Sequence, residues 1–358
     1  MPACPTPPSC PPRRPQHRLR RAAVAIAASL GFWAAAPSHA LEVDDLATIG
    51  HQLYSQWYLP QTTQALGAAQ ALQTSLQAYC GQRPGKTDAA LLGDARQRFQ
   101  QAADAWQRVA AVNMGPLVER RTDRMVNFQP LRPARLAEAI QQAPKTLADM
   151  ERIGSPGKGF PALEHLLWAQ PAPPGSPSCS YAVMAAASVT DEIQGLRAAF
   201  QTTAAAKPDL RVTEEFLNQW IGGLEQLRWE RMEKPLRSAS TTSGKKKPQL
   251  IRMDSDSTLA SWRAQWSGLR DLAVAPAGAP ENQVSIAGLV AAHYRPLTAG
   301  RFAKAVQEVD SAFAALNSTD LESVQKLSTA LSGLKRWVEA DIASLLQLSI
   351  GFSDGDGD

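Results

Sequence analysis

Hydrophobic residues recur along this chain at spacings of three and four, the spacing of one face of an α-helix. The clearest stretch follows residue 91 and places its apolar side chains on one face, namely Leu92, Ala95, Phe99, Ala102, Trp106 and Val109. The residues between them are mostly polar, so the opposite face of the helix would meet water. The pattern predicts an amphipathic helix that packs through Trp106.

The same periodicity continues along most of the chain. It predicts a last helix from Val324 to Leu345, and further helices over residues 44–79 (kinked at Pro60), 134–142, 160–169, 180–205, 211–235, 257–273, 284–294 and 297–316. No segment shows convincing period-two alternation bounded by turn residues, which is the pattern of a half-buried strand. The predicted fold class is therefore all-α, with up-and-down helical bundles.

Length and proline content indicate how these helices divide. At roughly 100 to 200 residues per domain, 358 residues suffice for one large domain or two modest ones. Pro208 ends one helix and disfavours the α conformation of Lys207. We therefore expect a first helical bundle over residues 41–206 and a second over residues 207–358.

The N-terminal segment has the layout of a secretory signal peptide. Arginines precede an apolar run from Ala22 to Ala36, and small residues at Ser38 and Ala40 follow it. The run is shorter than the ~20 residues needed to span a bilayer. The pattern predicts a signal peptide over residues 1–40, cleaved after Ala40, with a retained membrane anchor as the alternative.

Removing this segment changes the charge of the chain. The full sequence has 37 Lys and Arg against 33 Asp and Glu, a formal charge of +4. Five arginines and no acidic residue lie in residues 1–40, so the remainder has 32 basic and 33 acidic side chains, a charge of −1. Its one dense basic run, Lys245 to Lys247, lies among Ser, Thr, Gly and Pro, as in a solvated loop. Nucleic acid, which requires clustered basic residues, is thus not expected as a partner.

Two cysteines remain after residue 40, Cys80 and Cys179. An even number in an exported chain favours a disulfide, which would close a loop of about 100 residues. A buried pair of free thiols is the alternative that the sequence leaves open.

Common catalytic motifs are missing from the sequence. A zinc peptidase usually presents His-Glu-x-x-His on one helix face. The three histidines after residue 40, His51, His165 and His293, have no His or acidic residue three or four positions later. There is also no Gly-x-Ser-x-Gly elbow, and residues 154–159 lack the Gly-Lys-Ser/Thr ending of a phosphate loop. The sequence gives little support to an acyl hydrolase or a nucleotide enzyme.

Two segments suggest ligand chemistry. In Gly157 to Trp168, Pro161 fits the first turn of a helix, and Glu164 follows near its positive end. Glu164 is either a metal ligand or a complement to the helix dipole, and His165 points about 100° away from it. The terminus from Gly351 to Asp358 alternates Asp and Gly like the start of a calcium loop, with a disordered acidic tail as the alternative.

Together these two segments carry a resemblance to the imelysin family. Residues Gly159 to Trp168 resemble its Gly-x-His-x-x-Glu segment, which runs on into Leu-Leu-Trp/Phe. The ending Gly351 to Asp358 is similar to its Gly-Phe-x-x-x-Asp-Gly-Asp signature. Further matches between them extend the resemblance from about residue 42 to the end: Trp106 with Gly115-Pro116, the loop from Arg124 to Pro130, Leu227 to Leu236, and Cys80 with Cys179.

The resemblance implies two helical bundles related by a pseudo-twofold, with a site between them. The residues it assigns to this site are Gly159, Pro161, Glu164, His165, Arg124, Asp354, Asp356 and Asp358. The motif His is Pro161 in this chain. An imidazole ligand is thereby lost, which argues against family-type metal binding and metal-dependent hydrolysis.

The family consists of exported bacterial proteins that are often linked to iron acquisition and were first classed as metallopeptidases. Our hypothesis is a periplasmic, non-enzymatic binding module in iron or metal acquisition, with iron or a divalent metal held by carboxylates such as Glu164, and with a periplasmic or membrane iron-uptake partner. The alternatives are a metallopeptidase of the imelysin type and a helical scaffold that binds a peptide or protein. No transmembrane segment is expected after residue 40.

Overall fold

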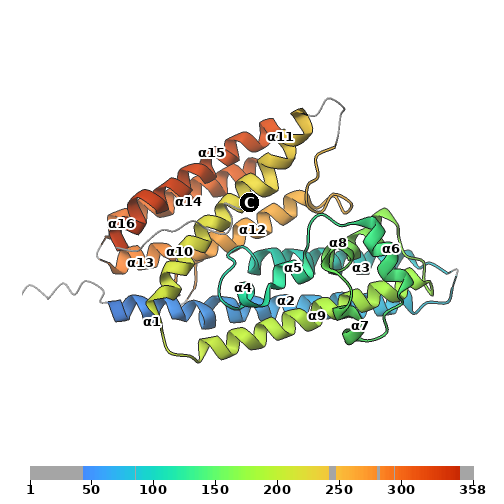
Figure 1. The fold of residues 1–358 in the computed structure, drawn as a ribbon. Helices are drawn as coiled ribbons and strands as arrows, with labels where there is room; N and C mark the ends of the chain where they lie inside the picture. The colour runs from blue at the N-terminus through green and yellow to red at the C-terminus, as the bar shows by residue number, and fades with distance from the viewer. Residues whose placement is uncertain (1–42, 85, 242–246, 280–282, 294, 347–358) are drawn as a thin grey trace, which may run out of the picture. The chain divides into compact units, whose positions relative to one another are not determined.

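The computed structural model describes residues 43–84, 86–241, 247–279, 283–293 and 295–346. Within these ranges all regular structure is helical and no strand occurs, as Figure 1 shows. The predicted all-α fold class is confirmed. The relation of two bundles by a pseudo-twofold, and the boundary between residues 206 and 207, stay predictions. The predicted signal peptide, the acidic terminus, and Lys245 and Lys246 lie outside the described residues.

The first half of the chain contains three long helices and several short ones. In chain order the elements are α1 (Val43–Leu53), the π-helix η1 (Tyr54–Tyr58), α2 (Leu59–Cys80), α3 (Ala89–Val109), α4 (Pro116–Arg120), α5 (Thr122–Val126), α6 (Pro133–Gln141), α7 (Leu147–Glu151), the 3₁₀-helix η2 (Ser155–Gly157), α8 (Gly159–Glu164), the π-helix η3 (His165–Ala169) and α9 (Pro177–Ala204).

The second half interrupts two of its longest helices with π-helical turns. Its elements are α10 (Leu210–Glu225), the π-helix η4 (Gln226–Glu233), α11 (Lys234–Thr241), α12 (Thr258–Ala273), α13 (Ile286–Ala292), α14 (Pro296–Ala315), α15 (Leu321–Trp337), the π-helix η5 (Val338–Ile342) and α16 (Ala343–Leu346). The predicted long helices are all present, with ends shifted by a few residues.

Side chains at the helix starts explain several of these boundaries. Asp88 accepts hydrogen bonds from the first N–H groups of α3, and Ser176, Asp209 and Asp320 do the same for α9, α10 and α15. Each of these oxygens satisfies N–H groups that have no partner inside the helix.

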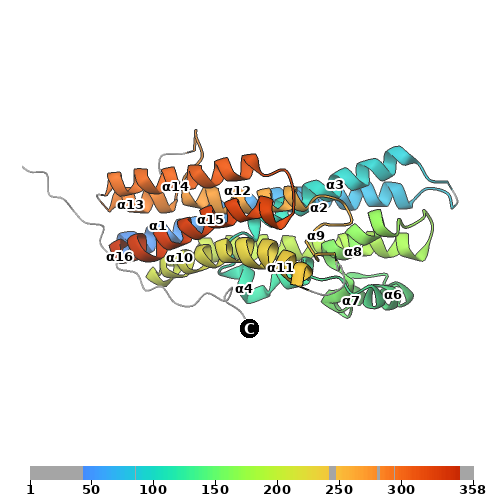
Figure 2. The ribbon, with the colours of Figure 1, turned by 90° about the horizontal axis from the view of Figure 1, so that it is seen from above.

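The long helices pack in two sets, and α12 and α10 of the second set contact α3 and α1 of the first. Helix α2 packs against α3 and α9, while α14 packs against α13 and α15 (Figures 1 and 2). Helix α12 of the second set lies along α3 of the first. Gly268 permits this approach, because a Cβ there would lie 2.4 Å from the backbone oxygen of Arg108.

The core is apolar and aromatic across both sets. Trp106, Trp220 and Trp262 are all fully buried, as the spacing in the sequence predicts for Trp106. The indole N–H of Trp106 donates to Asp123 over 2.9 Å, and that of Trp220 donates to the backbone oxygen of Leu269. Burial of these two rings therefore leaves their N–H groups satisfied, whereas the buried indole N–H of Trp262 has no hydrogen-bond partner among the described residues.

The predicted disulfide is present. Cys80 ends α2 and Cys179 lies in the first turn of α9, and their Cα atoms are 5.5 Å apart. The bond closes a loop with a sequence separation of 99 and fixes the end of α2 beside the start of α9.

None of the helices in the described ranges combines the length and apolar character needed to cross a bilayer.

Candidate functional site

The predicted motif begins where the backbone has room only for glycine. Gly159 starts α8 with a φ of 75°, and a Cβ there would lie 2.3 Å from the backbone oxygen of Val126. Because Gly159 has no Cβ, the start of α8 can pack directly against the end of α5. Pro161 is buried within the first turn of α8, where its missing N–H removes no helical hydrogen bond.

Glu164 ends α8 and is buried, and both of its carboxylate oxygens are engaged. Oε1 accepts hydrogen bonds from the backbone N–H and the hydroxyl of Ser255, over 3.0 and 2.7 Å. Oε2 lies 3.4 Å from Nη1 of Arg252. Both partners come from the loop of residues 249–257, about 90 positions further along the chain. Glu164 therefore joins α8 to this loop.

Arg252 is the cation of this cluster and is fully buried. Its guanidinium lies over the rings of Phe99 and Phe160, at 5.3 and 5.5 Å, and Nη2 donates to Asn127 Oδ1 over 2.7 Å. Burial lowers the pKa of Arg252, while the Glu164 carboxylate opposes this effect. We call Glu164, Arg252, Ser255 and Asn127 the Glu164 cluster. The cluster is buried, and its ion pair and hydrogen bonds link residues of both halves of the chain.

Asp104 of α3 is the nearby carboxyl with a strongly shifted pKa. Burial raises its pKa to about 6, and the charge of Arg252 acts in the opposite direction. Asp104 is thus more easily protonated than an exposed aspartate.

His165 contacts the same loop as Glu164 through a different residue. Its Nδ1 lies 3.5 Å from a carboxylate oxygen of Asp254. Glu164 and His165 therefore have separate partners, in line with the divergence expected of neighbouring helix positions.

A metal ion on Glu164 does not fit this arrangement. The Arg252 guanidinium already supplies the positive charge beside Oε2, and Ser255 supplies two donors to Oε1. A cation bound to either oxygen would face these donors and the guanidinium charge. In the described part of the chain, no group of three or more His, Cys, Asp or Glu side chains is arranged to hold a metal.

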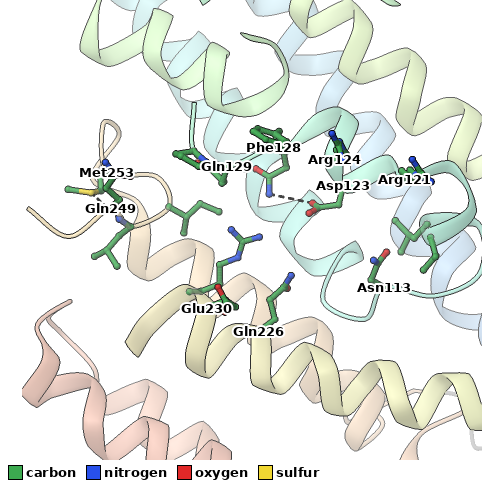
Figure 3. A pocket seen from close by; sticks show the side chains of 17 residues that line it. Asn113, Arg121, Asp123, Arg124, Phe128, Gln129, Gln226, Glu230, Gln249 and Met253 are labelled. Atoms are coloured by element: carbon green, nitrogen blue, oxygen red, sulfur yellow. Dashed lines mark hydrogen bonds between the residues drawn. The ribbon is translucent and has the colours of Figure 1, made fainter. Parts of the chain in front are cut away.

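A pocket of about 820 Å³ lies next to the Glu164 cluster, with Asn127 and the 249–257 loop forming part of its wall. Figure 3 shows residues of α5 on one side of it and residues of η4 on another. Its lining residues are Asn113, Leu117, Val118, Arg121, Asp123, Arg124, Asn127, Phe128, Gln129, Pro130, Gln226, Glu230, Arg231, Gln249, Leu250, Ile251 and Met253. We call it the arginine pocket, after Arg121, Arg124 and Arg231.

The π-helix η4 shapes one wall of the arginine pocket. Because a π-helical turn closes between residues i and i+5, side chains four and five positions apart lie over one another. Gln226, Glu230 and Arg231 have this spacing, and all three line the pocket. A regular α-helix, as predicted for residues 211–235, would place Glu230 and Arg231 at different angles to Gln226.

Backbone strain is concentrated around the same place. In the described ranges four non-glycine residues have a positive φ, and three of them are Arg121 in the pocket wall and Arg252 and Asp256 in the 249–257 loop. Such conformations persist where the surrounding structure enforces them, and they are common at functional sites. Their clustering supports this region as the functional site.

Comparison with known proteins identifies the family. The family model described as peptidase M75, imelysin, matches residues 58–339. The chain belongs to the imelysin family. Among curated proteins none matches the chain.

Two solved structures share the fold. An imelysin-like protein from Psychrobacter arcticum 273-4 superposes with a TM-score of 0.72 at 19% identity, over 87% of this chain and 98% of that one. A protein from Parabacteroides distasonis ATCC 8503, named as an iron-regulated protein A precursor, superposes with a TM-score of 0.69 at 13% identity, over 85% of this chain and 95% of that one. At these identities the likeness concerns the fold alone.

The imelysin motif residues occupy two distinct places in the structure. Glu164 belongs to the buried Glu164 cluster, with Gly159 and Pro161 in the same short helix, whereas Arg124 lines the arginine pocket. The assignment of Pro161 to the position of the motif His stays a prediction. Asp354, Asp356 and Asp358 lie outside the described residues.

Sequence reasoning missed Arg252, Arg121 and Arg231. Arg252 lies in a loop without periodicity, and its burial depends on rings of two helices far away in the chain. Arg121 joins α4 to α5, two helices of five residues each that are too short to produce a periodic pattern. Of the three, only Arg231 lies in a segment with a sequence signal, because Leu227 to Leu236 resembles the family.

Proposed function

We propose that this chain is an exported, non-enzymatic binding protein that receives its ligand in the arginine pocket. The observation that carries the proposal is the double use of the 249–257 loop. Arg252 and Ser255 of this loop hold Glu164, while Gln249 and Met253 of the same loop line the pocket. The motif glutamate therefore acts as a positioning residue that fixes a wall of the binding site.

The state of Glu164 supports binding over hydrolysis. A metallopeptidase needs a metal-bound water and a carboxylate free to act as base or ligand. Glu164 instead accepts two hydrogen bonds from Ser255 and pairs with buried Arg252. The predicted replacement of the motif His by Pro161 supports the same conclusion.

Export and a role in iron acquisition complete the proposal. The pattern of residues 1–40 supports export to the periplasm, and the Cys80–Cys179 disulfide suits an oxidising compartment. One structural neighbour is named as an iron-regulated protein, which supports the connection with iron. The proposal assigns this connection to the ligand or partner that the pocket receives, and not to a metal ion on Glu164.

A peptide-cleavage assay tests the proposal against the metallopeptidase alternative, which the family's name favours. The purified chain and its Glu164→Gln variant are incubated with a broad peptide library, with and without added zinc, iron or copper, and the products are followed by mass spectrometry. We expect no cleavage by either protein. Metal-dependent cleavage that the variant loses would overturn the proposal and make Glu164 a catalytic residue.

A metal titration tests the assignment of Glu164. We expect no tight binding of iron, zinc or copper that depends on this side chain, as measured by calorimetry with the Glu164→Gln variant alongside. Tight metal binding that is lost in the variant would show that Glu164 is a metal ligand.

A further inference from the structure

The arginine pocket carries more positive charge than its own wall neutralises. Arg121 and Arg124 are exposed on it and Arg231 is half-buried in it. In the described part of the chain none of the three forms an ion pair, and the Arg124 guanidinium lies over the Phe128 ring, 5.9 Å from its centre. Three arginines thus line one pocket, and none of them has a carboxylate partner among the described residues.

The two carboxylates of the pocket wall already accept hydrogen bonds from other residues. Asp123 accepts from the Trp106 indole over 2.9 Å and lies 3.4 Å from the side-chain amide of Asn127, the contact drawn in Figure 3. Glu230 accepts from Lys234 with both oxygens, at 2.9 Å each. Neither acid pairs with an arginine of the pocket.

Within the described ranges, Arg231 lacks a carboxylate partner and also has a buried N–H group without an acceptor. Its Nε–H is buried and has no hydrogen-bond partner among the described residues, as is also true of Arg252, but unlike Arg252 it forms no ion pair with a carboxylate there. Its charge also lies close enough to lower the pKa of buried Arg252, in addition to the larger effect of burial. An anion beside Arg231 would relieve this repulsion and give its guanidinium an acceptor.

The rest of the lining indicates an organic anion. Amide side chains of Asn113, Gln129, Gln226 and Gln249 offer neutral hydrogen bonds, and Leu117, Val118, Phe128 and Met253 offer apolar contact. A volume of about 820 Å³ is in the range that holds small molecules. A guanidinium presents parallel N–H donors that match two oxygens of a carboxylate or a phosphate.

We infer that the arginine pocket binds a small organic anion with several oxyanion groups, carboxylate or phosphate, through Arg121, Arg124 and Arg231. This inference rests on the proposed function, because it names the ligand class of the same site.

Isothermal titration calorimetry with citrate and with fructose 1,6-bisphosphate tests the inference at low and raised salt. We compare the full chain with Arg124→Gln, Arg231→Gln and the double variant, and with Arg301→Gln, which removes an exposed arginine of α14 outside the pocket. Thermal unfolding of each variant confirms that it folds.

We expect at least one probe to bind, about tenfold more weakly after loss of either pocket arginine, since each loses a charge-assisted hydrogen bond. Binding should weaken with salt and stay within about twofold for Arg301→Gln. Preference for citrate assigns the pocket to carboxylates, and preference for the bisphosphate assigns it to phosphates.

The inference is overturned if neither probe binds the chain with a Kd below about 1 mM, or if binding is unchanged in the double variant. These results leave the proposed non-enzymatic function intact. Peptide cleavage, in contrast, would overturn that function without bearing on the charge of the pocket.

Discussion

The Glu164 cluster and the arginine pocket share a wall, but the arginine of the cluster is paired with a carboxylate and, within the described ranges, the arginines of the pocket are not. In the cluster, the buried Arg252 has Glu164, Asn127 and two aromatic rings as partners. In the pocket, Arg121, Arg124 and Arg231 have no carboxylate partner among the described residues. Buried charges that are paired hold a structure together, whereas accessible charges that are unpaired remain available to a ligand.

This difference assigns a structural role to one family-like segment and a binding role to another, which the sequence resemblance alone does not distinguish. Glu164 is the motif carboxylate, and the structure uses it to fix the 249–257 loop. Arg124, from another segment with family resemblance, lies where a ligand has access. Changes in the cluster should therefore act on stability, and changes in the pocket should act on binding.

The largest effect is expected from Arg252→Met. It leaves Glu164 buried beside an apolar side chain, and loss of one partner of a buried ion pair typically costs about 3–5 kcal/mol. Chemical denaturation of the variant measures this loss. The double variant Glu164→Leu/Arg252→Met should be less destabilised than Arg252→Met, because no unpaired charge remains. Equal stability of Arg252→Met and the unmodified chain would contradict the structural role of the cluster.

Removal of the disulfide should affect stability and leave the pocket alone. The Cys80→Ser/Cys179→Ser variant opens a loop with a separation of 99, and we expect a loss of about 2–4 kcal/mol in the free energy of unfolding. Denaturation with and without reductant checks the value. Citrate or bisphosphate affinity measured on the folded variant should stay within about twofold, and a larger change would show that the bond also shapes the pocket.

The pH dependence of stability should include a contribution from Asp104. Its folded pKa of about 6 exceeds the ordinary value of 3.8, so the folded state holds this proton more tightly. The resulting stabilisation is fully present below about pH 4 and is lost as the pH rises through 6. Between pH 4.5 and 7.5, the chain should lose about 2 kcal/mol relative to an Asp104→Asn variant.

Denaturation of both proteins at the two pH values measures this difference. Because both proteins share every other titrating group, their difference isolates Asp104. A constant difference between them would show that Asp104 does not titrate in this range.

The smallest effect on stability is expected in the pocket. Arg124→Gln changes an exposed side chain that forms no ion pair in the described ranges, so the free energy of unfolding should change by no more than about 0.5 kcal/mol. Thermal unfolding checks this value. A loss as large as that of Arg252→Met would remove the distinction between the two regions.

The fold class and the long helices followed from the sequence because they depend on local periodicity. The spacing from Leu92 to Val109 matches α3, and the buried Trp106 lies on its predicted face. The short helices α4 and α5 were missed, since five residues cannot display a period. The π-helical turn η4 was read as α-helix, because the two forms differ by one residue per closed turn and not in composition.

For the candidate site, the sequence by itself determined which residue types were present and that a helix starts in this segment. Gly159, Pro161 and Glu164 lie in one short segment whose local geometry suits a helix start. Only the tertiary structure decided what Glu164 does, because its partners Arg252 and Ser255 arrive from a loop about 90 residues away. The same long-range packing brought Arg121, Arg124 and Arg231 to one pocket. Charges interact according to their distance in space, and this distance cannot be read from their separation in the sequence.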